Sequence, residues 1–219
     1  MTLSTAISYI DDYVNGTKTS TNSYVSDAIA YLATNGHYAP TAIAAYGITV
    51  NGYSADRFDN QILAFCNYWY NKYSSLGYKY NPMYVKAMIA VETKLGTYEG
   101  SRHGTTDIMQ CLDKDNPSVY CMAKIAPTNG VPYSSAEGLS YGMKSAGYTF
   151  VRNIFSGSTP SSSKYSSFIS LCSGILWLGY KTAVKGSLQD GVIAYNGGGD
   201  PDYWDKVYSC YLNPVAYLS

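Results

Sequence analysis

The sequence predicts a mainly α fold, and three observations support this prediction. The 219 residues are 46% hydrophobic, which is enough to bury a sizeable core. Several segments carry apolar residues at helical spacing, and capping residues and glycines mark the ends of these segments. We therefore expect residues 55–219 to form the main domain. Residues 1–54 should form a helical N-terminal appendage or a divergent part of that domain.

The first helices can be placed from these patterns. The N-terminal part has one helical candidate at 23–36, followed by an irregular neighbourhood at 47–54, "GITVNGYS". A stronger candidate covers 54–77, where Phe58, Ile62, Phe65 and Trp69 fall at helical spacing after a region of Ser and Asp that can cap a helix.

The following helices have similar signals. In "YNPMYVKAMIAVETKLG", Asn81 can cap, Pro82 suits the first helical position and Gly96 suits the end. Residues 97–160 are rich in Gly, Ser, Asn and Pro, which indicates loops with short helices near 135–155 and room for a small β-hairpin lining a cleft. Further helices are predicted at 163–184, where the helix should be central and buried, at 188–196 before three glycines, and at 203–212.

Composition excludes some classes of function. Lys plus Arg equals Asp plus Glu at 15 each, so no basic field would attract a nucleic acid. The start lacks the pattern of a signal peptide, and no apolar run is long enough to span a membrane. We expect a protein made in the cytoplasm that would need a route other than such a signal to act outside it.

Two residue types stand out in number. Tyrosine occurs 25 times, and its apolar ring with a polar tip suits either stacking on sugars or a wet core. The five cysteines lack CxxC spacing, which argues against a zinc site and favours buried thiols, with Cys111 and Cys121 the pair to test as a disulfide. We predict no metal and no cofactor. His103 with Cys111 gives only a weak indication of a cysteine nucleophile.

One acidic residue lies on an apolar helix face. Val85, Met88, Ile89 and Glu92 fall at helical spacing, so Glu92 should point toward the core or a cleft. Burial disfavours the charged form, so a raised pKa would keep this carboxyl protonated, as a general acid requires. The alternative is a structural glutamate paired with a cation or turned back to solvent.

Three segments in order, "AMIAVETKLG", "TTDIMQCLD" and "GILWLGYKTAVKGSLQDGVIAYNGGG", resemble the lysozyme-like superfamily of lytic transglycosylases and goose-type lysozymes. In that family a helix carries Glu followed by Ser, a Gly-Leu-Met-Gln stretch follows, and an Ala-Tyr-Asn segment completes the set. The resemblance covers about residues 78–211. It implies a lysozyme-like α+β fold and cleavage of the β-1,4 bond between N-acetylmuramic acid and N-acetylglucosamine in peptidoglycan.

The resemblance also implies roles for individual residues. Glu92 would be the catalytic acid, and Thr93 stands where the family has Ser. The substrate-binding residues would be Thr93, Met109, Gln110, Tyr195 and Asn196. Glycan strands of peptidoglycan would be the partner.

The second segment departs from the family pattern, because Asp107 replaces the glycine. Asp107 is therefore either a second catalytic carboxylate, with Asp113 as another candidate, or a turn residue. An inverting hydrolase needs such a base. In a lytic transglycosylase the muramyl 6-hydroxyl attacks internally, and no base of this kind is needed.

The resemblance thus predicts a peptidoglycan-degrading glycosidase, either transglycosylase or muramidase. The alternative is a non-catalytic wall-binding or structural component of a phage tail or secretion apparatus. Either protein could be phage-encoded or exported by a machine, with residues 1–54 as the docking part.

Overall fold

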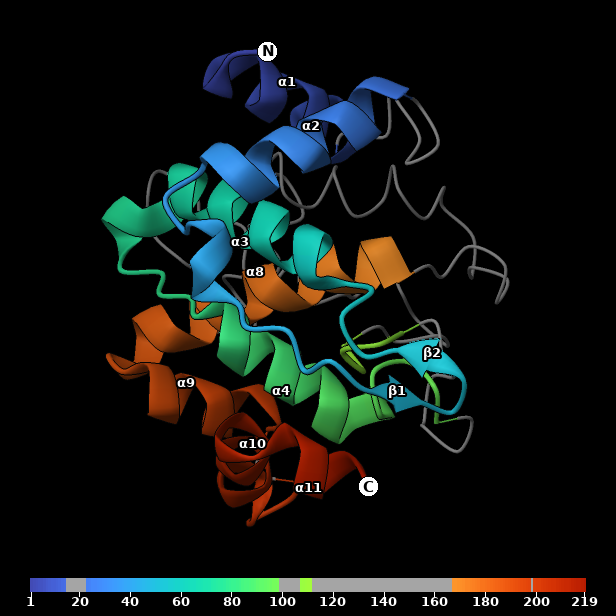
Figure 1. Cartoon of the computed structure of the whole chain (residues 1–219). Coiled ribbons are helices and arrows are strands. Elements are labelled where there is room, and N and C mark those ends of the chain that lie inside the picture. The colour runs from blue at the N-terminus through green and yellow to red at the C-terminus, as the bar shows by residue number, and fades with distance from the viewer. Residues whose placement is uncertain (15–22, 99–106, 112–166, 198) are drawn as a thin grey trace, which may run out of the picture.

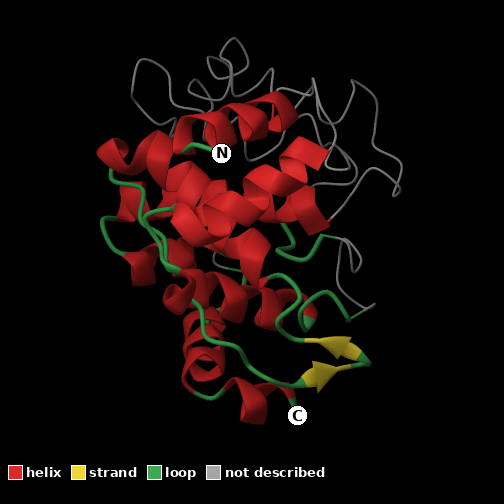
Figure 2. Ribbon diagram, turned by 45° about the horizontal axis from the view of Figure 1, so that its top comes forward, coloured by secondary structure: helices red, strands yellow, loops and turns green. Residues whose placement is uncertain are grey.

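The computed structural model describes residues 1–14, 23–98, 107–111, 167–197 and 199–219. This part of the chain is mainly helical, which confirms the mainly α prediction (Figure 1, Figure 2). The α-helices are α1 (Leu3–Val14), α2 (Ser23–Asn35), α3 (Asp59–Tyr73), α4 (Pro82–Thr93), α8 (Ser167–Lys185), α9 (Leu188–Tyr195), α10 (Tyr203–Leu212) and α11 (Pro214–Leu218). Short 3-10 turns cover Pro40–Ala42 and Ser74–Leu76, and two strands, β1 (Thr49–Val50) and β2 (Tyr53–Ser54), form a hairpin.

Helix α3 lies in the middle of the molecule, between α1 and α2 on one side and α8 and α4 on the other (Figure 1). All its residues from Ile62 to Trp69 are buried, and the indole nitrogen of Trp69 donates to the carbonyl of Cys172 in α8 at 2.8 Å. Helix α9 packs on α8, and α10 packs on α4. The candidate site lies where α4, α10 and the segment 107–111 meet.

The first two helices pack onto α3. The sequence pattern did not predict α1, yet its Ala6 and Ile10 are fully buried in the same hydrophobic core as α2 and α3. Asn67 of α3 is buried and donates to the carbonyls of Leu32 and Tyr38, while its side-chain oxygen accepts from the Tyr38 amide. The seam between α2 and α3 is therefore held by a satisfied buried amide as well as by apolar packing.

The start of α4 follows the predicted capping signals, whereas the helix ends at Thr93, three residues before Gly96, with Lys94 in a left-handed conformation. The side chain of Asn81 accepts from the amides of Met83 and Tyr84, and Pro82 takes the first turn. Ser187 caps α9 in the same way by accepting from the Asp190 amide. Both caps satisfy amides that have no partner within the helix.

The predicted start of α3 was wrong. The helix begins at Asp59 after Phe58, without a side-chain cap, because Ser54 is used in β2 and Asp56 in another contact. The Asp56 carboxylate accepts from the amides of Tyr46 and Gly47 and from Lys86.

The hairpin lies in the neighbourhood that the sequence analysis treated as irregular. Val50 pairs with Tyr53, and the two residues between them, Asn51 and Gly52, both have positive φ. Two positive φ values are the geometry of a type I′ turn, which Asn-Gly favours. The hairpin and short helices predicted within 97–160 lie outside the described residues.

A buried lysine links α4 to the segment before α3. Lys86 is 0% exposed, and its amino group lies 2.6 Å from Asp56 and 2.8 Å from Asp59. It also donates to the carbonyl of Ala44 and lies over the ring of Tyr46. These contacts compensate a charge that would otherwise be costly to bury.

In the described ranges, no helix has both the length and the apolar character that a membrane span requires.

Candidate active site

Glu92 lies in the last turn of α4 and is half-buried. Its Oε1 accepts a hydrogen bond of 2.7 Å from the hydroxyl of Tyr203, the first residue of α10. Tyr203 is only 2% exposed, and burial together with the Glu92 charge raises the pKa of its hydroxyl well above the usual value. The phenol therefore stays protonated through neutral pH and remains a donor to the carboxyl group.

A second buried tyrosine approaches the same carboxyl from α9. Tyr195 donates from its hydroxyl to the carbonyl of Met109 at 2.8 Å. Burial raises the pKa of Tyr195, and the nearby Cys111 and Glu92 raise it further. Glu92, Met109 and Tyr195, which the sequence analysis selected from three separate segments, thus lie in one neighbourhood.

Thr93 joins α4 to the segment 107–111. The side chain is fully buried, and its Oγ1 lies 2.9 Å from the carbonyl oxygen of Ile108 and 3.1 Å from that of Ile89. The same oxygen accepts from the amide of Gly96. Thr93 therefore fixes the chain on both sides of Glu92, and its side chain is enclosed by these backbone contacts.

The backbone around this junction is unusual. The part of the chain that the structure describes has four non-glycine residues with positive φ, and three of them, Lys94, Leu95 and Gln110, flank the Thr93 contact. Such left-handed conformations cost free energy for residues with a Cβ. They gather at functional sites, where the surrounding structure holds them in place.

Asp107 lies inside the turn that it begins. The residue is 0% exposed, and its Oδ1 accepts from the hydroxyl of Ser170 at 2.6 Å and from the amide of Cys111 at 3.2 Å. Its carbonyl accepts from the amide and the side chain of Gln110. These contacts are those of a turn-stabilising aspartate, one of the two roles that the sequence left open. Asp113 lies outside the described residues.

The other predicted substrate-binding residues serve the local backbone in this structure. Gln110 is half-buried, and its side-chain amide donates back to its own turn. Asn196 follows α9, and its side-chain oxygen accepts from the amide of Asp200 at 2.7 Å. Asn196 therefore stabilises the glycine-rich loop between α9 and α10. This loop leads to Tyr203, which contacts Glu92.

Met109 is positioned by α8. It is fully buried, its amide donates to the hydroxyl of Ser170, and its side chain lies against Gly174. A Cβ at position 174 would come within 2.5 Å of the Met109 sulfur and 2.8 Å of its Cβ. Only glycine at position 174 allows the two segments to approach this closely.

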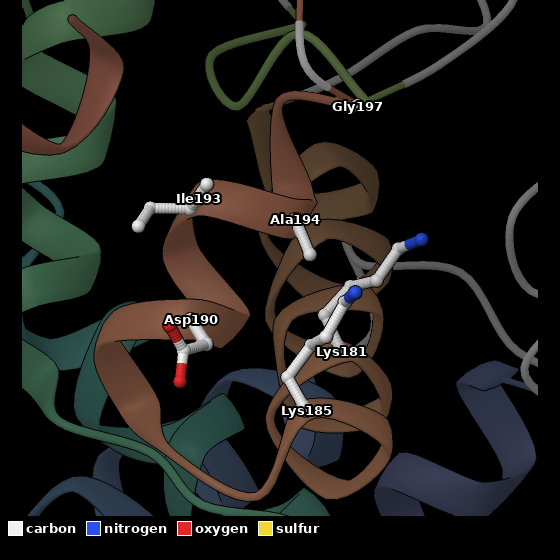
Figure 3. A pocket seen from close by; sticks show the side chains of 6 residues that line it. All are labelled: Lys181, Lys185, Asp190, Ile193, Ala194 and Gly197. Carbon is white, nitrogen blue, oxygen red and sulfur yellow. The ribbon is translucent and has the colours of Figure 1, made fainter. Parts of the chain in front are cut away.

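A pocket of about 510 Å³ opens over α8 and α9, beside this site but not in it. Figure 3 shows the residues that line it: Lys181, Lys185, Asp190, Ile193, Ala194 and Gly197. The two lysines lie one turn apart on the same face of α8. None of the predicted site residues lines this pocket.

Cysteines and histidines add no further chemistry in the described ranges. Cys66 and Cys210 are free, buried thiols, and burial raises the pKa of Cys210 to about 11. Cys121 and His103 lie outside the described residues, so neither the predicted disulfide test pair nor the weak thiol and imidazole pair can be placed. Within the described ranges, no group of three or more His, Cys, Asp or Glu side chains gathers as metal ligands would.

Comparison with known proteins gave no match to any family model, curated protein or solved structure. The resemblance to the lysozyme-like superfamily therefore rests on the residues of this chain alone.

Tyr203 was not predicted as a site residue from the sequence. Tyrosine was considered only as a residue type, suited to stacking on sugars or to a wet core. The available signal was position, since Tyr203 opens a helix directly after a glycine-rich loop that follows Tyr195 and Asn196. A short loop of this kind brings the start of α10 back toward the end of α9.

Proposed function

We propose that the protein is a peptidoglycan-degrading glycosidase of lysozyme-like type, with Glu92 as the general acid. The observation that carries the proposal is the hydrogen bond from the buried, protonated Tyr203 to the half-buried Glu92. A fixed donor orients the carboxyl group, and orientation of the acid toward the leaving oxygen is part of general acid catalysis.

The proposed reaction begins when Glu92 protonates the glycosidic oxygen between N-acetylmuramic acid and N-acetylglucosamine. The bond from the anomeric carbon to that oxygen breaks, and the leaving sugar departs with the proton. In the lyase form, the carboxylate of Glu92 then takes the proton of the muramyl 6-hydroxyl as that oxygen closes on the anomeric carbon. Tyr203 donates to the carboxylate at this stage and stabilises its charge.

The surroundings of Asp107 favour the lyase form over the inverting hydrolase. An inverting hydrolase places a second carboxylate about 6.5–9.5 Å from the acid, with a water molecule between them. Asp107 is buried, and its Oδ1 already accepts from Ser170 of α8 and from the amide of Cys111 in its own turn. In the lyase form Glu92 carries out both proton transfers. The protein would reach the cell wall as a phage-encoded enzyme or through a separate export route.

The test is mass spectrometry of the products that the protein and its Glu92→Gln variant release from purified peptidoglycan. Glutamine keeps the shape of the side chain and can still accept from Tyr203, so circular dichroism and unfolding should match the parent. Products that end in 1,6-anhydromuramic acid, and are lost in Glu92→Gln, are the expected result. Reducing muramic ends would support a hydrolase instead. An active Glu92→Gln variant, or an inactive parent protein, would overturn the proposal.

A further inference from the structure

Four aromatic side chains form a strip along one side of the α4 and α10 pair. Tyr84 of α4 lies 4.4 Å from Tyr211 and 5.5 Å from Trp204, measured between ring centroids. Tyr208 lies 5.6 Å from Trp204 and 6.2 Å from Tyr211. All four pairs have interplanar angles of 15° or less, so the rings face in nearly the same direction. We refer to Tyr84, Trp204, Tyr208 and Tyr211 as the aromatic strip.

The aromatic strip lies at the surface. On α10 the buried residues are Tyr203, Val207 and Cys210, and each residue of the strip on this helix immediately follows one of them. Tyr208 is 41% exposed, and the other three rings are half-buried. Because near-parallel rings at these centroid distances stack on one another, neighbouring rings cover part of each other's faces, and the strip exposes the remaining apolar ring surface together with the polar groups at the ring edges.

The strip runs along the same two helices that hold Glu92. Tyr203 meets Glu92 at one end of the α4 and α10 pair, and Tyr211 stacks on Tyr84 at the other. The two contacts are eight positions apart on each helix, so α4 and α10 run antiparallel. This spacing places Tyr84 about 12 Å along α4 from Glu92, whereas Trp204 directly follows Tyr203, so the strip extends away from the neighbourhood of Glu92 over a length that a bound polymer chain can span.

The chemistry of the strip matches a sugar better than a charged ligand. The four side chains carry no charge, and Lys206, the one basic residue of α10, is paired with Asp200 at 2.6 Å. A nucleic acid would require cations along its phosphates. A hexosamine ring instead offers an apolar C–H face to the aromatic rings and hydroxyl or amide groups to the phenols.

We propose that the aromatic strip is a carbohydrate platform that binds N-acetylhexosamine units of a glycan strand at a distance from the cleavage point. This inference rests on the proposed function for the identity of the polymer, because it places the strip and Glu92 along one bound strand. Binding to the strip itself requires no catalysis.

Tryptophan fluorescence provides the test, because the chain has three tryptophans and one belongs to the strip. Trp69 is 3% exposed, so the Trp177→Phe variant leaves Trp204 as the reporter that a ligand can reach. Titration of this variant with an N-acetylglucosamine hexamer should give a saturable change in emission. The change in emission should be lost when Trp204→Phe is added to the Trp177→Phe variant.

The Tyr208→Ala substitution, made in Trp177→Phe, should weaken hexamer binding about tenfold, the loss expected for one aromatic stacking contact. Tyr208→Leu keeps apolar bulk without a flat ring and should weaken binding as well. Tyr70→Ala is the matched control. Tyr70 is a half-buried tyrosine of α3, and its ring stacks on His37 with the ring centroids 3.7 Å apart. A titration without saturation, or equal affinity in Tyr208→Ala and the parent, would overturn the proposal.

The two proposals fail in different ways. If the protein releases no sugars from peptidoglycan but binds the hexamer through Trp204 and Tyr208, the platform stands and the glycosidase does not. If the protein cleaves peptidoglycan and Tyr208→Ala neither binds the hexamer more weakly nor slows the cleavage, the glycosidase stands and the platform does not. The Glu92→Gln variant should bind the hexamer as the parent does.

Discussion

The side-chain oxygen of Thr93 lies 2.9 Å from the carbonyl oxygen of Ile108, so the residue next to Glu92 also anchors the segment that carries Met109. This contact is buried, and the same oxygen accepts from the amide of Gly96 at the end of α4. One hydroxyl group thus connects the end of α4 with the turn at 107–111.

Thr93→Val should destabilise the protein by about 1–3 kcal/mol, because valine keeps the shape but leaves buried backbone groups without their partner. Thr93→Ser should lose much less, since it retains the hydroxyl. Urea unfolding of both variants measures the difference. Equal stabilities of Thr93→Val and Thr93→Ser would show that the hydroxyl contributes nothing.

Tyr203→Phe should keep the fold and lower the rate of glycan cleavage about 10- to 100-fold, by loss of one oriented donor to the acid. The variant should also move the alkaline limb of the pH profile to higher pH. The sign follows because removing a donor to the ionised carboxylate disfavours that form, so the proton is held to higher pH. Measurement of kcat between about pH 4 and 9 tests this, with Tyr70→Phe as the control, since Tyr70 lies on α3 and stacks on His37. A limb that moves to lower pH would contradict the assigned role.

Gly174→Ala should destabilise the protein by about 1–3 kcal/mol, since the added methyl group overlaps the side chain of Met109. Met109→Ala in the same chain should recover part of this loss by making room. A double-mutant cycle of unfolding free energies isolates the coupling. Additive effects of the two substitutions would mean that overlap with the Met109 side chain is not the cause of the destabilisation by Gly174→Ala.

Lys86→Met should cost about 3–5 kcal/mol at pH 7, because it leaves Asp56 and Asp59 facing each other without their cation. Burial favours the neutral form of both carboxyls and already raises the pKa of Asp59. In Asp56, hydrogen bonds from Lys86 and from the Tyr46 and Gly47 amides outweigh burial and lower the pKa.

The pH dependence of this loss has a definite sign. Without Lys86 both carboxyls should bind protons more tightly in the folded state than in the unfolded one, so protonation stabilises the variant. The stability gap between the parent and Lys86→Met should therefore shrink as the pH falls below about 5, toward the ordinary carboxyl range. Chemical unfolding at several pH values measures it, and a gap that widens in acid would contradict the ion-pair account.

Local signals in the sequence were enough to place several elements. Asn81 and Pro82 predicted the start of α4, because Asn81 caps amides within its own turn and proline suits the first helical position. Ser54 and Asp56 carry the same kind of signal but serve a strand and a distant lysine instead. Local chemistry cannot distinguish these uses, since the competing partner is far away in the sequence.

The candidate site was predicted to a similar extent. A carboxyl group on an apolar helix face was visible at Glu92, because helical spacing alone places it there. Its partner Tyr203 follows more than a hundred residues later, and only the folded chain brings the two together. The buried role of Asp107 was equally hidden, because Ser170, the side chain that occupies its carboxylate, comes from α8.

The seam between α2 and α3 bears on how the chain can be divided. Asn67 directs its side chain to Leu32 and Tyr38, and Gly36 lies so close that any Cβ there would collide with the Asn67 side chain. A chain that began at residue 55 would leave the side-chain amide of Asn67 without these partners. It would also expose to water the surface of α3 that α2 covers. The first 54 residues therefore cannot be exchanged as an independent unit. A variant that lacks them should be tested for a folding defect before any loss of targeting is inferred.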